Sequence, residues 1–157
     1  MSELTEGNPA PDFSLPGDGE SEITLSAHRG KTVVVYFYPK DNTSGCTKEA
    51  VAFNELAGDF EKAGAVIIGV SPDPVKSHDK FKEKYDLSFA LAADEEKAAA
   101  QAYDVWKEKS MYGKKYMGVE RSTFLVAPDG TLAKIWRKVK VPGHAEAVLA
   151  AARALKG

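Results

Sequence analysis

The chain has 157 residues, of which 43% are hydrophobic, so it is long enough to bury the core of one ordinary domain. Its 21 basic and 23 acidic residues give a net charge of −2, which argues against a nucleic-acid-binding protein. No apolar run approaches the roughly 18 residues that a membrane span needs, and the acidic start is unlike a secretory signal. We therefore expect a cytoplasmic protein whose residues 1–157 form a single domain and that binds neither nucleic acid nor membrane.

The first strong pattern along the chain is a strand followed by a helix and a second strand. Residues 32–38 are apolar on both faces and rich in valine, which is typical of a strand in the middle of a sheet. Pro39 ends this strand, and residues 47–63 then carry apolar side chains at helical spacing, with Gly64 at the helix end. Residues 65–70 read as a second buried strand, so the pattern predicts a right-handed unit with two parallel strands.

Two further helices are expected in the middle of the chain. Asp73 and Pro74 predict a helix that begins with them and runs to about Tyr85. The acidic residues 94–96 predict another helix that runs to about Tyr103. In both cases the acidic side chains lie at the positive end of the helix dipole, which favours these starts.

The C-terminal part predicts an antiparallel hairpin and a final helix. Residues 122–127 and 131–136 are rich in strand-forming side chains and are joined by a Pro-Asp-Gly turn. Residues 143–155 predict an alanine-rich helix. The side chains that we expect to face inward on it are Val148, Leu149, Ala152 and Leu155. The order of elements favours an α/β fold with a central mixed β-sheet flanked by helices.

Residues 107–120 show no clear periodicity, and we interpret them as an ordered loop that packs its aromatic side chains on the domain. A nucleic-acid contact is the alternative for such a basic and aromatic mixture, but the acidic net charge disfavours it. The basic and large apolar members are Lys107, Lys109, Met111, Tyr112, Lys114, Lys115, Tyr116 and Met117. Trp106 and Trp136 are expected at the edge of the core.

Cys46 is the only cysteine, so no disulfide can form within the chain, and a reducing compartment fits this composition. It lies in the link between the first strand and the long helix, at the carboxyl end of a parallel strand, where such sheets bind ligands. Free N–H groups and the partial positive charge of a helix start favour the thiolate over the thiol. Because its immediate neighbours are small or polar, we favour a reactive cysteine over an inert buried one.

Two other side chains could act together with Cys46. Thr43 lies three residues before it, where a Cys-x-x-Cys oxidoreductase carries its other thiol, so its hydroxyl could orient a substrate or cap the helix. Arg121 immediately precedes a predicted strand, and its guanidinium could bind a thiolate and a substrate oxygen together. Taken alone, Arg121 would more often form a surface ion pair.

The histidines and glycines give little support for other chemistry. His28, His78 and His144 share no metal-ligand spacing, and we expect them at the surface or at helix ends. A cysteine hydrolase or transferase would need a histidine base near Cys46, and His28 is the nearest in sequence, which makes this a poor alternative. The sequence has no glycine-rich phosphate motif, so we predict no cofactor and no metal.

Several segments of the sequence resemble a known family. They are YFYPKDNTSGCTKEA at residues 36–50, GVSPD at residues 69–73, GVERSTF at residues 118–124 and APDFSLP at residues 10–16. The similarity runs essentially from end to end, and the sequence is identified as a member of the bacterioferritin comigratory protein, or Q-type, branch of the peroxiredoxins. The resemblance implies a thioredoxin-like fold and a thiol peroxidase that reduces hydrogen peroxide and organic hydroperoxides.

The resemblance also implies a role for each matching residue. Cys46 is similar to the peroxidatic cysteine, which attacks the terminal peroxide oxygen and becomes a sulfenic acid. Thr43 would hydrogen-bond the peroxide, and Pro39 would shield the pocket from bulk water. Arg121, with backbone N–H groups near Gly45 and Cys46, would stabilise the thiolate and the charge that develops on the oxygens.

Two positions depart from the family pattern. Val51 stands five residues after Cys46, where many members carry a resolving cysteine, and Ser44 replaces a common proline. The sulfenic acid must therefore be reduced by thioredoxin, glutaredoxin or a low-molecular-weight thiol, or form a disulfide between two copies. The resemblance favours a monomer over a dimer and leaves both open. The alternative function is a peroxide sensor or thiol-binding module that forms mixed disulfides with partner proteins and stops near one turnover.

Overall fold

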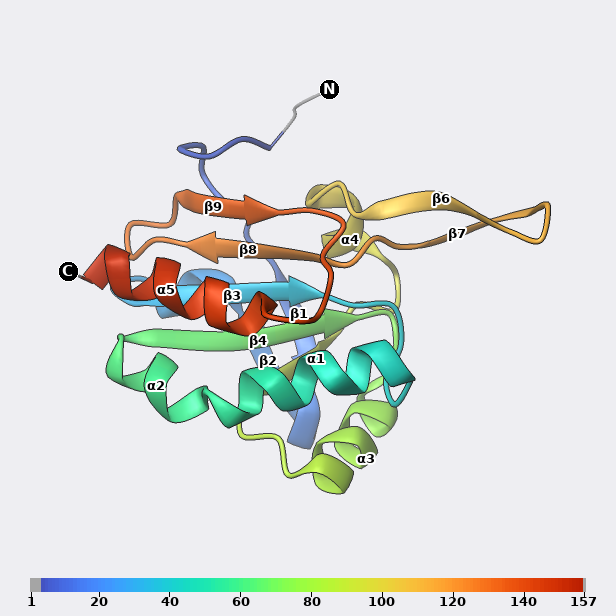
Figure 1. The fold of residues 1–157 in the computed structure, drawn as a ribbon, viewed down its shortest axis with the longest axis horizontal. Coiled ribbons are helices and arrows are strands. Elements are labelled where there is room, and N and C mark those ends of the chain that lie inside the picture. Colours follow the sequence, from blue (N-terminus) through green and yellow to red (C-terminus); the bar gives the residue numbers. More distant parts are fainter. Residues whose placement is uncertain (1–3, 157) are drawn as a thin grey trace.

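The structure, a computed structural model that describes residues 4–156, is built on a seven-stranded mixed β-sheet (Figure 1). Its strands are β1 (Ser14–Gly17), β2 (Ser21–Thr24), β3 (Thr32–Phe37), β4 (Ala65–Ser71), β5 (Ala90–Ala93), β8 (Ser122–Val126) and β9 (Leu132–Trp136). Their order is β2-β1-β5-β4-β3-β8-β9. The central strands β3, β4 and β5 run parallel, and the outer strands pair antiparallel. This confirms the predicted fold class.

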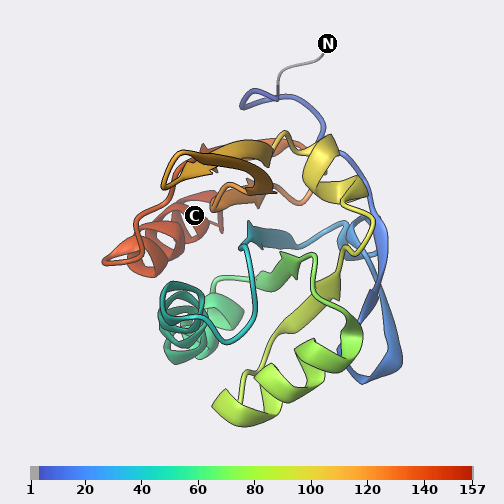
Figure 2. The ribbon, with the colours of Figure 1, turned by 90° about the vertical axis from the view of Figure 1, so that its right-hand side faces the viewer.

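Helices cover both faces of the sheet, and a separate hairpin projects from one end of it. The helices are α1 (Ser44–Glu55), α2 (Ala57–Lys62), α3 (Val75–Tyr85), α4 (Ala98–Ala102) and α5 (His144–Lys156), with 3₁₀ turns η1 (Asp18–Glu20) and η2 (Leu25–His28). Figure 2 shows α1, α2, α3 and α5 on one face, and α4 with the N-terminal segment on the other. The hairpin consists of β6 (Trp106–Met111) and β7 (Lys114–Val119), and it extends beyond the sheet in Figure 1.

The central strand β3 is buried on both faces, as its sequence predicts. Val35 and Phe37 belong to the core cluster on the α4 side, whereas Val34 and Tyr36 belong to the cluster under α1 and α5. Side chains of a strand alternate between faces, so a strand covered by helices on both sides must be apolar throughout. Packing on both faces therefore fixes the position of β3, and the loop that follows it begins at the carboxyl end of the parallel strands.

The predicted helix over residues 47–63 is wrong at its start and in its middle. α1 begins at Ser44, so Cys46 lies inside its first turn rather than in the preceding link. At Leu56, with φ of −100° and ψ of 5°, α1 ends and α2 begins, because the Leu56 N–H donates to the Phe53 carbonyl in a tighter turn at 3.1 Å. Gly64 follows α2 with φ of +75°, which confirms the predicted helix end.

The next two helices also begin later than expected. α3 starts at Val75, with Pro74 rather than Asp73 as the residue before its first turn. α4 starts at Ala98, yet the Asp94 carboxylate still accepts two N–H groups of its first turn at 3.1 and 2.8 Å. The acidic residue therefore caps the helix as predicted, across a longer turn.

Residues 107–120 are not the loop that we expected. They form most of the β6–β7 hairpin, whose two-residue turn places Tyr112 at φ 53° and Gly113 at φ 78°. The Tyr112 side chain is 97% exposed, so it does not pack on the domain. The short strands β1, β2 and β5 also had no counterpart in the prediction, whereas the β8–β9 hairpin is confirmed.

The remaining packing predictions are mostly confirmed. Trp106 and Trp136 are half-buried and pack against the two core clusters. On α5, Val148, Leu149 and Ala152 are buried as predicted. Leu155, in the last turn of the helix, is 40% exposed, so its predicted inward position is wrong. Among residues 4–156, no helix is long and apolar enough to cross a membrane.

Candidate active site

Cys46 is the third residue of α1 and lies at the carboxyl end of the parallel strand β3. Its side chain is only 2% exposed. The first helical hydrogen bond runs from the Thr47 N–H to the Thr43 carbonyl at 2.8 Å, so the N–H groups of residues 44–46 have no acceptor within the helix. These N–H groups give the helix start a partial positive charge, which stabilises an anion at this position.

The Arg121 guanidinium joins Cys46 to a buried carboxylate. Its Nη2 donates to Cys46 Sγ at 3.2 Å, and its Nη1 donates to Glu49 Oε1 at 2.6 Å. Cys46 and Glu49 are three residues apart on α1 and therefore share one helix face. Gly45 leaves room for the guanidinium, since a Cβ there would stand 3.2 Å from Nη2. Because the guanidinium is rigid and planar, the bond of Nη1 to Glu49 holds Nη2 in place against the Cys46 sulfur.

Burial and charge oppose each other in this cluster. Burial raises the pKa of Glu49 to about 7, and the neighbouring Arg121 charge works against that rise. Burial alone would lower the pKa of Arg121, but Glu49 and Cys46 beside it raise that pKa above its ordinary value. Among the described residues, the second oxygen of Glu49 is buried and has no hydrogen-bond partner. Because no N–H or O–H group donates to this oxygen, nothing there stabilises the ionised form of Glu49 over the protonated form.

Lys109 of β6 brings a second positive charge to the same region. Partial burial lowers its pKa, the Arg121 charge lowers it further, and the opposite charge of Cys46 raises it. Its aliphatic stem lies along the base of the hairpin, 3.2 Å from where a Cβ of Gly118 would stand. The hairpin therefore borders the cysteine through a lysine that our sequence analysis left unassigned.

Thr43 and Pro39 lie in the loop that leads from β3 to Cys46. The Thr43 hydroxyl donates to the Lys40 carbonyl at 2.9 Å and is exposed to solvent. Thr43 is the residue before α1, but its side chain makes no capping hydrogen bond to the helix. Pro39 is half-buried directly after β3. Both residues lie in the loop that precedes Cys46, and among residues 4–156 Arg121 is the side chain that hydrogen-bonds to its sulfur.

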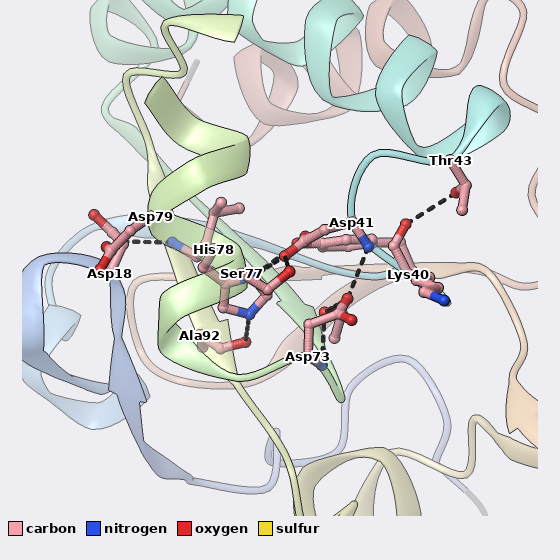
Figure 3. A network of polar contacts seen from close by, with 12 residues as sticks. Asp18, Lys40, Asp41, Thr43, Asp73, Ser77, His78, Asp79 and Ala92 are labelled. Atoms are coloured by element: carbon pink, nitrogen blue, oxygen red, sulfur yellow. Dashed lines mark hydrogen bonds and ion pairs between the residues drawn. The ribbon is translucent and has the colours of Figure 1, made fainter. Parts of the chain in front are cut away.

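A buried polar network fixes this loop to α3 (Figure 3). Asp41, 7% exposed, accepts from the Tyr38 hydroxyl at 2.5 Å, from the Ser77 hydroxyl at 2.8 Å, and lies 2.7 Å from His78 Nδ1. The other ring nitrogen of His78 donates to the Ala92 carbonyl at 2.9 Å. Every oxygen of the Asp41 carboxylate is satisfied, as a buried charge requires.

A second aspartate ties the same loop to the end of β4. The Asp73 carboxylate accepts the Asp41 N–H at 2.7 Å and the Ser71 hydroxyl at 2.8 Å. This explains why Asp73 does not cap α3. Asn42 adopts φ of 59°, and its side-chain oxygen accepts from the Tyr85 hydroxyl at 3.1 Å. The loop conformation before Cys46 is therefore determined from both sides.

The expected position at the surface or at a helix end is wrong for His78, whereas His144 lies at a helix start, as expected, but is buried. His78 is fully buried on the inward face of α3, where Asp41 satisfies it. His144 begins α5 but is 7% exposed, and its Nε2 lies 2.8 Å from the Thr123 hydroxyl. Burial, with a smaller contribution from the Arg121 charge, lowers the pKa of His144 to about 4.

No cysteine–histidine pair is found in the part of the chain that the structure describes. His78 and His144 bond to the partners above, and His28 lies with Gly64 and Ala65 around a hollow at the opposite, amino end of the parallel strands. Within residues 4–156, no group of three or more potential ligands is arranged to hold a metal ion. The chemistry available at Cys46 is that of a sulfur nucleophile beside a guanidinium and free backbone N–H groups.

Sequence reasoning missed Glu49, Asp41 and Lys109. Glu49 could have been found from its position one helical turn after Cys46, because an arginine brought to that face needs a second acceptor. Asp41 and Asp73 follow adjacent parallel strands, whose carboxyl ends meet at one edge, so their contact could also have been anticipated. Nothing in the local sequence indicates that Lys109 lies near enough to Cys46 and Arg121 to interact with their charges.

Comparison with known proteins gives consistent results. The model of the AhpC/TSA family matches residues 7–135. The chain is 55% identical over 148 residues to "Peroxiredoxin Bcp" of Xanthomonas campestris, covering 93% of this chain and 92% of that one. It is 54% identical to "Peroxiredoxin Bcp" of Bacillus subtilis, with 88% of each chain covered. A solved structure of the bacterioferritin comigratory protein of Xanthomonas campestris, described for its alkyl peroxide reduction activity, is 50% identical, with a TM-score of 0.91 over 98% of this chain and 100% of that one.

Proposed function

Because the chain belongs to the AhpC/TSA family and is a peroxiredoxin, a thiol peroxidase, we propose that Cys46 reduces hydroperoxides and that an outside thiol regenerates it. The observation that carries the proposal is the 3.2 Å contact between Arg121 Nη2 and Cys46 Sγ. A hydrogen bond from a permanent cation stabilises a negative charge on sulfur, and the thiolate is the nucleophilic form.

The peroxide step transfers one oxygen atom to sulfur. The Cys46 thiolate attacks the terminal oxygen of the hydroperoxide, an S–O bond forms and the O–O bond breaks. The leaving hydroxide or alkoxide takes up a proton and departs as water or alcohol, while sulfur is oxidised to sulfenic acid. Arg121 and the free N–H groups of residues 44–46 surround the place where the negative charge moves from sulfur to oxygen.

Thr43 and Pro39 are proposed to prepare the substrate for this attack. The Thr43 hydroxyl donates its hydrogen to the Lys40 carbonyl, so its oxygen keeps lone pairs that can accept the O–H of a hydroperoxide. Pro39 has no N–H group to hold water and is half-buried at the start of the loop. We therefore assign substrate orientation to Thr43 and partial water exclusion to Pro39.

The recycling step needs a thiol from outside the chain. Cys46 is the only cysteine, so its sulfenic acid condenses with an external thiol to give a mixed disulfide and water, and a second thiol then releases Cys46. Hydrogen peroxide and small organic hydroperoxides are the proposed substrates. Alkyl peroxide reduction by the Xanthomonas campestris relative supports the organic class.

Steady-state turnover with single reductants tests the proposal. Peroxide loss is measured with hydrogen peroxide or cumene hydroperoxide and with thioredoxin, glutaredoxin, glutathione or dithiothreitol added alone. We expect many peroxides consumed per chain with at least one reductant, and none with the Cys46→Ser variant. Consumption that stops near one peroxide per chain with every reductant would instead identify a peroxide sensor. Unchanged turnover by Cys46→Ser would refute the role of Cys46.

A further inference from the structure

Large apolar side chains are concentrated on the β6–β7 hairpin rather than spread over the surface. Among the described residues, five large hydrophobic side chains are exposed, and four of them lie on the hairpin or its turn. They are Met111 at 56%, Tyr112 at 97%, Tyr116 at 45% and Met117 at 49%. Met111 and Tyr116 share one face of the hairpin beside the Tyr112 turn, whereas Met117 lies on the other face. Because isolated apolar residues on a surface need no explanation but a group of them does, the face with Met111 and Tyr116, together with Tyr112, is a candidate interaction surface.

Tyr112 occupies a position that local physics does not explain. The turn holds Tyr112 and Gly113 at positive φ, 53° and 78°, a conformation for which Asn-Gly is the preferred pair in two-residue hairpin turns. A bulky residue is strained there, and at 97% exposure this side chain gains nothing from burial. An observed strain without a structural benefit points to a function outside the folded chain.

The hairpin also carries a charge opposite to that of the whole chain. Residues 106–119 contain four lysines and one glutamate, which gives +3, whereas the chain as a whole carries −2. Lys114 is exposed at the start of β7, and Lys109 is half-buried and interacts electrostatically with Arg121 and Cys46. A partner that fits this surface needs acidic groups around an apolar centre.

The hairpin stands beside Cys46. β7 ends at Val119, two residues before Arg121, whose guanidinium bonds to the cysteine sulfur. In the register of the hairpin, Lys109 faces Tyr116 and Met111 faces Lys114, so these four side chains share one face. Lys109, a member of that face, lies near enough to Arg121 and Cys46 for their charges to act on it, and Figure 1 shows the hairpin at the same end of the molecule as the start of α1.

We propose that the β6–β7 hairpin is the docking surface for a protein dithiol with an acidic, partly apolar rim, which reduces oxidised Cys46. This inference rests on the proposed function, because a chain with one cysteine needs an outside thiol. The docked partner's thiol attacks the Cys46 sulfenic acid, an S–S bond forms and water leaves. The partner's second thiol then attacks the partner sulfur that is bonded to Cys46. A disulfide forms within the partner, and Cys46 is released as a thiol.

The Tyr112→Asn variant separates docking from folding. Asparagine suits positive φ better than tyrosine, so the urea midpoint of the variant should not fall. Loss of an aromatic anchor should raise the KM for reduced thioredoxin or glutaredoxin about tenfold or more. Dithiothreitol-supported turnover and the single-turnover rate of Cys46 oxidation should stay at the wild-type level. Leu155→Ser, which removes an exposed apolar side chain elsewhere, is the matched control and should change none of these values.

A second variant tests the charge complementarity. Lys114→Glu should lower kcat/KM for the protein reductant roughly tenfold at low salt, and the difference should shrink as the salt concentration rises. An unchanged KM for both protein thiols in the Tyr112→Asn variant would overturn the proposal, as would wild-type turnover that only dithiothreitol or glutathione supports. A parallel loss of the peroxide oxidation rate would show damage to the active site and contradict docking. Failure of Cys46 to react with peroxide at all would instead refute the proposed function.

Discussion

Two segments border Cys46 and are built in opposite ways. The loop over residues 39–43 is anchored by buried polar contacts, with Asp41 7% exposed and three donors on its carboxylate. The β6–β7 hairpin projects from the sheet and carries Tyr112 at 97% exposure. The contrast teaches that the loop fixes distances at the sulfur, whereas the exposed side chains of the outer part of the hairpin, residues 111–117, pack on nothing in the fold. Changes in the loop and its contacts should therefore affect chemistry or stability, and changes to these exposed hairpin side chains should affect neither.

The largest effect is expected from the guanidinium that touches the sulfur. Arg121→Met removes the donor to Cys46, and loss of one such preorganised donor costs about 100- to 1,000-fold in rate. The measurement is the second-order rate of Cys46 oxidation by hydrogen peroxide in a stopped-flow experiment. Arg153→Met, at an exposed surface ion pair with Asp59, is the control and should keep the wild-type rate. A loss of less than threefold in Arg121→Met would contradict the role of the guanidinium.

The next effect concerns the buried network of the loop. The Asp41 carboxylate accepts hydrogen bonds from Tyr38, Ser77 and His78. Asp41→Asn replaces one of its two oxygens by an NH2 group, which cannot accept, so at least one buried donor loses its partner. We expect a loss of about 2–4 kcal/mol in the free energy of unfolding, measured by urea denaturation. Asp59→Asn, at an exposed ion pair, should cost less than about 1 kcal/mol. Equal stability of the two variants would show that the network does not anchor the loop.

The pH dependence of stability should reveal two opposing groups behind the active site. His144 has a pKa of about 4 in the folded chain, below its ordinary value of 6.5, so it destabilises the fold as the pH drops from 6.5 toward 4. Glu49 has a folded pKa of about 7, above its ordinary value of 4.5, so its stabilising effect is complete below pH 4.5 and is lost as the pH rises to 7.

Single variants separate these two contributions. Glu49→Gln should lose stability more steeply than the wild type between pH 7 and pH 4.5, by on the order of 1–2 kcal/mol. His144→Gln should lose less stability than the wild type over the same interval. Urea midpoints measured at closely spaced pH values give both slopes. If the stability of a variant changes with pH in parallel with that of the wild type, the group that it removes does not titrate in this interval.

The smallest expected effect comes from one methyl group beside Arg121. Gly45→Ala places a Cβ 3.2 Å from Nη2, which shifts the guanidinium by a few tenths of an ångström and should slow Cys46 oxidation roughly two- to tenfold. Alanine is the better helix former, so the variant should not lose stability. Gly58→Ala, in open space in α2, should gain about 0.5–1 kcal/mol and keep its oxidation rate. Equal oxidation rates for Gly45→Ala and the wild type would show that the guanidinium position is not critical.

The parts of the fold that could be predicted are those whose pattern is strong and local. β3 and β4 are apolar on both faces, and the turn before β9 has a distinctive Pro-Asp-Gly sequence, so the central strands and the last hairpin were found. β5 consists of ALAA, which has no strand preference and is a strand only because β4 pairs with it. The hairpin turn was missed because tyrosine is an unusual residue at positive φ.

The candidate site shows the same division. Cys46 and Arg121 were singled out from residue type and position, and the structure brings them together across 75 residues of sequence. Pro39 and Thr43 lie nearby, and their roles stay predictions. The sequence alone does not reveal Glu49, Asp41 and Lys109, because their importance depends on which side chains face them. The residue type of His78 predicts a position at the surface or at a helix end, whereas the buried carboxylate of Asp41 makes its burial favourable.

The most direct test of the account is the mass of the protein and of its peptides after one equivalent of hydrogen peroxide. With thiols blocked only after oxidation, we predict one added oxygen atom located on the peptide that contains Cys46, and its loss on treatment with a reducing thiol. Oxygen found on Met111 or Met117 while Cys46 still reacts with a thiol-blocking reagent would contradict the central claim that Cys46 is the site of peroxide reduction.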